Sequence, residues 1–258
     1  MVDGDTSSTI TFHNKPMLLA ILSDIHGNYQ ALQAVLADID GHDVDLIYTL
    51  GDNIGYCPQP EEVVQALMAR DARSILGNHE LALKSKSYLK RLNFVVQDSL
   101  ALTRKLMGPE TIAFSTSLPS FRVENNTRFV HGCPPESVTT YLQNPSPTRL
   151  ERTFATYPEQ YCFYGHTHAF GRYLSDGKRY WAEKAEIGQV LLNDMWRHIN
   201  NVGSVGQPRD GKGNSAKYGL WNTESNSLEI RALEYDVAET VALLKKLGFH
   251  ASNASRLL

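Results

Sequence analysis

Four short apolar runs in this chain, and a weaker fifth, end in residues that commonly bind metal ions. In chain order the runs and the residues after them read LLAILSDIHGN, LIYTLGD, SILGNHE, RFVHG and YCFYGHTH. Residues two apart in a strand point the same way, so Asp24 and His26 can both reach one ion. Open α/β sheets keep their active sites where strands end. We therefore expect these runs to be strands whose final residues meet in one site.

Helical spacing separates the first three runs. The strands are expected over Met17–Leu22, Asp45–Leu50 and Arg73–Leu76, and the apolar positions within Asn28–Ile39 and Pro60–Arg70 recur at helical intervals. Alternation of strand and helix requires right-handed crossovers. The first third of the chain therefore predicts a mostly parallel sheet with helices on both faces.

The middle of the chain changes character. Glu80–Met107 predicts two helices, and Phe114–Pro119 resembles a turn. Ser120–Glu124 and Thr127–Val130 flank an Asn-Asn pair and predict a hairpin. Thr148–Ala155 predicts one short helix before the GHTH motif.

Short strands dominate the remainder of the chain. They are expected over Gly171–Leu174, Lys178–Trp181, His198–Val202, Tyr218–Asn222 and Leu228–Leu233, and the amphipathic helix Asp236–Leu247 follows them. These strands predict a second, largely antiparallel sheet that packs on the first. The expected fold is α/β, a four-layer α-β-β-α sandwich with a mixed sheet packed on a largely antiparallel one and helices outside.

The length and apolar content suit one large domain. With 258 residues, of which 42% are hydrophobic, the chain can bury a substantial core. Residues 1–15 are rich in Ser, Thr, Asp and Gly without a sustained period, which predicts a disordered N-terminal extension. The domain is expected over residues 16–258.

Charge and cysteine content limit the partners and the compartment. A net charge of −3 gives no broad basic surface, so nucleic acid is not an expected partner. Three widely spaced cysteines argue against a disulfide framework and indicate a reducing compartment. No apolar stretch approaches the ~18 residues of a membrane span, and the first fifteen residues lack a signal-peptide core. We expect a cytoplasmic protein without a membrane partner, and a homo-oligomer is left open.

The residues at the strand ends form a set of oxygen and nitrogen donors. The candidate metal ligands are Asp24, His26, Asp52, Asn78, His131, His166 and His168. This set suits Mn, Fe, Co, Ni or Zn better than Ca or Mg, which prefer oxygen alone. Seven ligands exceed the need of one ion. Two ions about 3.5 to 4 Å apart that share a carboxylate would use the set, an arrangement typical of phosphoester hydrolysis.

In this order, the motifs resemble those of the calcineurin-like metallophosphoesterase superfamily. The family series Asp-x-His, Gly-Asp, Gly-Asn-His-Glu, His-Gly and Gly-His-x-His stands here as DIH, GD, GNHE, HG and GHTH. The later run VGSVGQPRDG looks like the NPGSVGQPR segment of the bacterial and archaeal phosphoesterase branch. Each motif alone is weak, but five in register are a specific signal.

The resemblance implies a role for each of these residues. One ion would be held by Asp24, His26, Asp52 and His168, and the other by Asp52, Asn78, His131 and His166. Asp52 would bridge the two ions, with manganese as the leading candidate and iron, zinc, cobalt or nickel as alternatives. His79 would contact the phosphate and protonate the leaving oxygen after in-line attack by a metal-bridging hydroxide. Glu80 is expected to cap the following helix rather than bind metal.

One position departs from several branches of the family. These branches carry an arginine soon after the Gly-Asp pair, whereas this chain reads GDNIGYCPQP. A bidentate phosphate clamp is therefore missing there. Besides His79, substrate contacts are expected from Asn28, Tyr56 and Arg209. The departure favours small diester or nucleotide substrates over phosphoproteins.

The predicted function is therefore a metal-dependent phosphohydrolase, a phosphodiesterase or phosphomonoesterase acting on a small phosphoester or nucleotide. A dinucleoside polyphosphate hydrolase and a Ser/Thr protein phosphatase are the alternatives within the enzyme class. A non-catalytic interaction module on the same fold, as in the sorting-coat subunit of the family, is the alternative outside it. His79 and all seven ligand positions are filled, which favours an enzyme. Cys57 and Cys133 lie beside the expected site and are alternative soft ligands, although free cysteines more often pack as small apolar residues.

Overall fold

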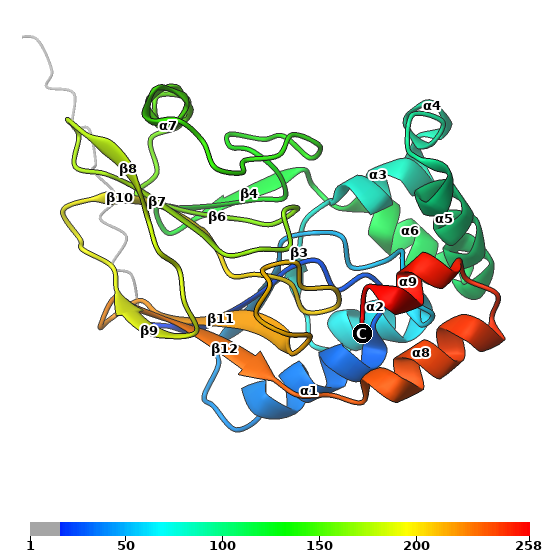
Figure 1. The fold of residues 1–258 in the computed structure, drawn as a ribbon. Helices are drawn as coiled ribbons and strands as arrows, with labels where there is room; N and C mark the ends of the chain where they lie inside the picture. Colours follow the sequence, from blue (N-terminus) through cyan, green and yellow to red (C-terminus); the bar gives the residue numbers. More distant parts are fainter. Residues whose placement is uncertain (1–15) are drawn as a thin grey trace, which may run out of the picture.

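Two six-stranded sheets face each other in the computed structural model, which describes residues 16–258 (Figure 1). The first sheet has the order β3 (Arg73–Ser74), β2 (Leu46–Thr49), β1 (Leu18–Leu22), β11 (Ala216–Asn222), β12 (Ser227–Leu233) and β9 (Gly188–Leu191). The second has the order β4 (Phe121–Glu124), β5 (Thr127–Val130), β6 (Tyr161–Tyr164), β10 (Arg197–Asn201), β7 (Gly171–Ser175) and β8 (Tyr180–Glu183). The extension predicted over residues 1–15 lies outside the described residues, and the prediction of one domain over residues 16–258 stays a prediction.

The inner faces of the two sheets form an aromatic and aliphatic core. Ile21 and Trp221 of the first sheet pack with Phe129 and Phe163 of the second, and all four are buried. Tyr48 stacks on Phe129 with ring centroids 4.0 Å apart. Burial of large apolar side chains is the main force that holds such sheets together.

Helices cover the two outer faces. The helices α1 (Tyr29–Ile39) and α2 (Pro60–Ala69) lie against the first sheet, where Leu32 of α1 joins a core cluster with Tyr218 of β11. The helix α7 (Pro147–Phe154) lies on the other side of the sandwich, and its Phe154 packs in the same cluster as Ile199 (Figure 1). The predicted α-β-β-α layering is confirmed.

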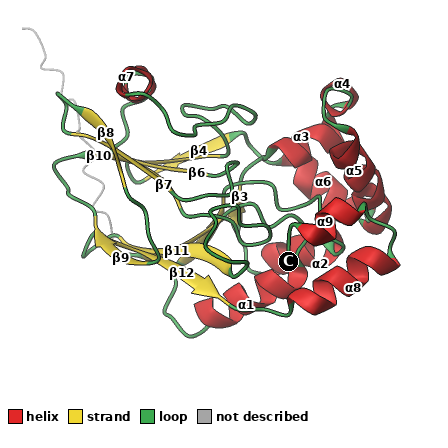
Figure 2. Ribbon diagram, in the orientation of Figure 1, coloured by secondary structure: helices red, strands yellow, loops and turns green. Residues whose placement is uncertain are grey.

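The other helices gather at one end of the sandwich (Figure 2). They are α3 (Asn78–Lys84), α4 (Lys86–Leu89), α5 (Phe94–Leu106), α6 (Pro109–Ser117), α8 (Val237–Lys246) and α9 (Ala251–Ser255). The prediction of a turn at Phe114–Pro119 was wrong, because α6 continues to Ser117. Three helices rather than two occupy Glu80–Met107. Over residues 16–258, no helix has the length and apolar character needed to cross a membrane.

The assignment of strands to sheets differs from the prediction at β11 and β12. Both were expected in the second sheet, but β11 pairs antiparallel with β1 and β12 pairs with β11, so they complete the first sheet. The first six residues of β11 are buried, which suits a central strand. The second sheet is mixed, since β6 lies parallel to both β5 and β10. Period-two alternation shows which faces of a strand are buried but not which neighbour it pairs with.

Candidate metal centre

The loops that carry the candidate ligands come from both sheets and meet between them. Asp24, His26 and Asp52 follow β1 and β2 of the first sheet, Asn78 begins α3, and His131, His166 and His168 follow β5 and β6 of the second sheet. The backbone N–H of His26 donates to the carbonyl of Asp52 at 2.8 Å. The backbone N–H of His166 donates across the sheets to Asp24 Oδ2 at 3.0 Å. The expected meeting of strand ends is therefore present, with two sheets contributing instead of one.

Several ligand residues have a left-handed backbone conformation. The positive φ angles are 52° for Asp24, 55° for His26, 53° for Asp52, 68° for His166 and 56° for His168. Few non-glycine residues adopt such angles, although Asp, Asn and His do so more readily than others. Strained backbone of this kind concentrates at functional sites. These sharp turns direct side chains two residues apart toward the clusters: Asp24 and His26 both reach the first cluster, whereas His168 reaches the first and His166 the second.

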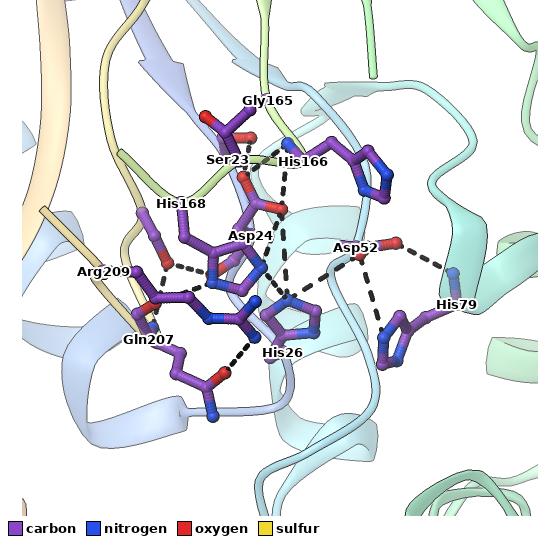
Figure 3. A network of polar contacts seen from close by, with 12 residues as sticks. Ser23, Asp24, His26, Asp52, His79, Gly165, His166, His168, Gln207 and Arg209 are labelled. Atoms are coloured by element: carbon purple, nitrogen blue, oxygen red, sulfur yellow. Dashed lines mark hydrogen bonds and ion pairs between the residues drawn. The ribbon is translucent and has the colours of Figure 1, made fainter. Parts of the chain in front are cut away.

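The first cluster consists of Asp24, His26, Asp52 and His168, whose ligand atoms all lie within 4.8 Å of one another. The Nε2 atoms of His26 and His168 are 3.0 Å apart (Figure 3). His26 Nδ1 faces the carbonyl oxygen of Ile54 at 3.2 Å, and His168 Nδ1 faces that of Gln207 at 2.7 Å. Burial is the main cause that lowers the pKa of both imidazoles, so both rings are neutral.

The second cluster consists of Asp52, His131 and His166, again within 4.8 Å, with Asn78 beside them. His131 Nε2 lies 3.1 Å from Asn78 Oδ1 and 3.1 Å from His166 Nδ1. His131 Nδ1 faces the carbonyl oxygen of Leu50 at 2.7 Å, and His166 Nε2 faces that of Thr139 at 3.2 Å. Asp52 is shared by the two clusters.

Each of the four histidines has one ring nitrogen that faces a backbone carbonyl and one inner nitrogen that faces its cluster. A carbonyl oxygen only accepts hydrogen bonds, so in each neutral ring the nitrogen that faces it carries the proton. In the first cluster, the Nε2 atoms of His26 and His168 therefore present lone pairs to each other at 3.0 Å. Such an arrangement is repulsive unless a cation lies among the donors. Backbone hydrogen bonds that fix the tautomer in this way are typical of metal-ligating histidine.

Asp52 lies where a bridging carboxylate is needed. Its Oδ2 is 3.7 Å from His26 Nε2 of the first cluster and 3.4 Å from His131 Nε2 of the second. Its Oδ1 accepts the backbone N–H of His79 at 2.9 Å. Buried Glu80 in turn accepts the backbone N–H groups of Asp52 and Gly77, each at 3.0 Å. Glu80 therefore caps α3, as predicted, and it also holds the Asp52 turn, which was not predicted.

The donor set fits borderline divalent ions, and thiolates do not contribute to it. Carboxylate oxygen, amide oxygen and imidazole nitrogen together favour first-row transition ions. Burial raises the pKa of Cys57 to about 12, which keeps this thiol protonated. Among the described residues, the groups able to hold a metal ion contain neither Cys57 nor Cys133. The soft-ligand alternative is therefore not supported.

The imidazole of His79 lies beside the clusters. His79 Nε2 is 3.9 Å from Asp52 Oδ2, and the ring meets His26 edge-on with centroids 4.6 Å apart. His79 Nδ1 is buried and has no partner within the described chain. A Cβ on Gly55, where φ is +105°, would lie 2.0 Å from this atom, so glycine is needed to accommodate the ring. His79 Nε2 therefore faces Asp52 and the clusters, while Nδ1 lies against Gly55.

Comparison with known proteins decides the family. The model of the calcineurin-like phosphoesterase superfamily domain matches residues 17–226, which include every residue of both clusters. The chain belongs to this superfamily. This member is 32% identical over 235 residues to an uncharacterised protein of Methanocaldococcus jannaschii, covering 89% of this chain and 92% of that protein.

Solved structures agree with the family assignment. A crystal structure of a metallophosphoesterase from Sphaerobacter thermophilus superimposes on this phosphoesterase with a TM-score of 0.80 and 30% identity, covering 94% of this chain and 98% of that one. A hypothetical protein from Pyrococcus horikoshii OT3 gives a TM-score of 0.73 at 18% identity, covering 93% and 97%. The likeness to the second protein supports the fold alone.

Of the predicted substrate-contact residues, Asn28 is enclosed by the protein, whereas Tyr56 lies beside the metal clusters. Asn28 is fully buried and caps α1, and its amide also donates to the carbonyl of Gly206 and to the hydroxyl of Tyr235. A substrate contact from Asn28 is therefore not supported. The ring of Tyr56 lies 4.6 Å from the rings of both His26 and His79, and thus forms a wall of the site.

Two supporting features were not found from the sequence. The segment after β10 packs on the Asp24 turn, where Ser204 Oγ donates to the carbonyl of Asp24 at 2.8 Å and a Cβ on Gly206 would lie 1.8 Å from the carbonyl oxygen of Ile25. Tyr141 stacks on His166 with centroids 3.8 Å apart. The VGSVG run gave a signal for the first feature, but no sequence pattern indicated Tyr141.

Metal uptake by this phosphoesterase should release protons. Burial opposes a charge on His131, yet the carboxylates of Asp52 and Asp24 outweigh it and raise the pKa of the ion-free His131 to about 9. A metal ion needs the deprotonated inner nitrogen, so binding near pH 7 should release about one proton, and affinity should rise roughly tenfold per pH unit between pH 7 and pH 9. Calorimetric titration of metal-free protein with Mn²⁺ in buffers of different ionisation enthalpy measures this release. A binding enthalpy that is the same in every buffer would contradict the prediction.

Proposed function

We propose that this protein is a metal-dependent hydrolase of phosphoesters, with a small phosphodiester, phosphomonoester or nucleotide as substrate. The observation that carries the proposal is the pair of buried clusters that share Asp52. Bound ions would supply charge neutralisation for the phosphate oxygens and a water molecule of lowered pKa. Manganese is the first ion to test, followed by iron, zinc, cobalt and nickel.

The chain's own residues orient the reaction. Asp52 holds the two ion sites in a fixed relation, because its oxygens face both clusters and the backbone of His79. His79 is proposed to donate a proton to the leaving oxygen from its buried position beside Asp52. Burial lowers the pKa of its imidazole and the Asp52 carboxylate opposes this effect. A bound phosphate adds negative charge nearby, which favours the protonated imidazole.

A direct assay tests the proposal. Protein treated with a chelator should be inactive on bis-p-nitrophenyl phosphate and on p-nitrophenyl phosphate, and Mn²⁺ should restore hydrolysis of at least one of them. Absence of hydrolysis with every divalent ion of the series would overturn the proposal and favour the binding-module alternative. A panel with dinucleoside polyphosphates and phosphopeptides then separates the remaining substrate classes.

A further inference from the structure

The loop over residues 202–215, which joins β10 to β11, places the positively charged side chain of Arg209 beside the first metal cluster. The backbone N–H of Arg209 donates to the carbonyl of the cluster residue His168 at 2.9 Å. The guanidinium carbon lies 5.7 Å from the centre of the Tyr56 ring. Figure 3 shows the side chain extending toward His26 and His168.

The guanidinium of Arg209 keeps most of its donors free. One nitrogen, Nη2, donates to Gln207 Oε1 at 2.5 Å. Within residues 16–258, no carboxylate forms an ion pair with Arg209. A guanidinium offers five N–H donors in a planar fork that matches phosphate oxygens. The side chain is therefore suited to an anion at the mouth of the site.

A buried ion pair fixes the loop immediately after Arg209. Lys217 of β11 is fully buried, and its Nζ donates to Asp210 Oδ1 at 2.9 Å. The same Nζ donates to the carbonyl oxygens of Gly213 at 3.1 Å and Lys212 at 3.3 Å. All three ammonium donors are thus used, and the chain from Asp210 to Gly213 winds around one nitrogen. A buried ammonium is costly unless it is paired in this way.

We infer that Arg209 binds the substrate phosphate and that Lys217 positions it through Asp210. The inference rests on the proposed phosphoester hydrolysis. The Nζ of Lys217 contacts Asp210, Lys212 and Gly213 and no residue of either metal cluster, so Lys217 is a positioning residue. Asp210 links Lys217 to Arg209, because its carboxylate accepts a hydrogen bond from Lys217 and it is the next residue after Arg209 in the chain.

The first experiment measures phosphate binding and hydrolysis in Arg209 variants. Arg209→Ala should weaken the affinity of the Mn²⁺-loaded protein for inorganic phosphate and raise KM for bis-p-nitrophenyl phosphate, each by roughly 10- to 100-fold. Metal content should not change. Arg209→Lys should recover only part of the loss, because a single ammonium cannot form the bidentate contact. Lys178→Met, at an exposed position between β7 and β8, is the control and should behave as the unchanged protein.

The second experiment tests whether Lys217 acts through Arg209. Lys217→Met combined with Asp210→Asn removes the ion pair without leaving a buried charge. Asp210→Asn alone leaves the Lys217 ammonium buried without its carboxylate and is the harsher variant. Both should raise KM more than they lower kcat, and both should speed amide hydrogen exchange in residues 209–213. In the Arg209→Ala background they should have no further effect on phosphate affinity. This non-additivity is the signature of two residues that act as a unit.

The outcomes distinguish a failure of the proposed function from a failure of the inference about Arg209 and Lys217. If the unchanged protein neither hydrolyses phosphoesters nor binds phosphate when loaded with metal, the proposed function fails. If it does both and Arg209→Ala has the affinity of the unchanged protein, only the clamp inference is overturned. If Lys217 and Arg209 variants have additive effects, the positioning role of Lys217 is overturned.

Discussion

Replacement of His79 by alanine is expected to lower turnover by roughly 10²- to 10⁴-fold while both ions stay bound, the usual range for loss of a positioned acid. The metal sites should survive because His79 contacts Asp52 Oδ1 through its backbone N–H, which alanine retains. The lost group is the imidazole, whose Nδ1 has no partner in the described chain. Steady-state kinetics together with elemental analysis of bound metal measure the two effects separately.

Two further variants sharpen the His79 experiment. His79→Asn keeps a polar side chain but cannot donate a proton from an imidazolium, and should be almost as slow as the alanine variant. His42→Ala, in the turn after α1, is the matched control and should keep full turnover. Full activity in His79→Ala would remove His79 from the mechanism. Loss of metal in that variant would instead assign it a structural role.

Replacement of Asp52 by asparagine is expected to weaken both ion sites at once. Its Oδ2 lies 3.7 Å from His26 Nε2 and 3.4 Å from His131 Nε2, so the same charge serves both clusters. Because metal ions contribute several kcal/mol of charge stabilisation, turnover should fall by roughly 10³-fold or more. Asparagine tolerates the left-handed φ of 53° at this position, so the backbone should keep its conformation. Elemental analysis after dialysis against buffered Mn²⁺ gives the occupancy of the variant.

Asp24→Asn is the matched comparison for Asp52→Asn. Asp24 belongs to the first cluster alone, and its φ of 52° is equally suited to asparagine. This variant should lose the ion of one cluster and keep that of the other. Equal metal loss in the two variants, or full occupancy after Asp52→Asn, would contradict the bridging assignment.

Much of the site could be predicted because its residues are close in sequence to strand ends. The spacing of Asp24 and His26 already pointed to one ion, and the structure places both in the first cluster, although they lie in the turn after β1 and not in the strand itself. His168 joins this cluster and His166 joins the second, as the motif order implied. The expected positions of β1 and β2 were also close to those observed. These predictions depend on local patterns, which a sequence displays directly.

Non-local pairing and packing could not be predicted in the same way. Nothing in the sequence of β11 indicates that it pairs with β1, about 200 residues earlier, because strand pairing depends on the whole set of competing partners. The stacking of Tyr141 on His166 and the complete burial of Asn28 are likewise tertiary facts. Asn28 was mistaken for a substrate contact because a cap residue and a binding residue can have the same neighbours in sequence.

The origin of the ligands in two different sheets has a consequence for the whole molecule. Each cluster takes donors from the first sheet, through Asp52, and from the second, through His168 or through His131 and His166. A cation held there is a cross-link between the halves of the sandwich, so its binding energy also favours the folded chain. Scarcity of metal would then reduce the amount of intact protein as well as its chemistry.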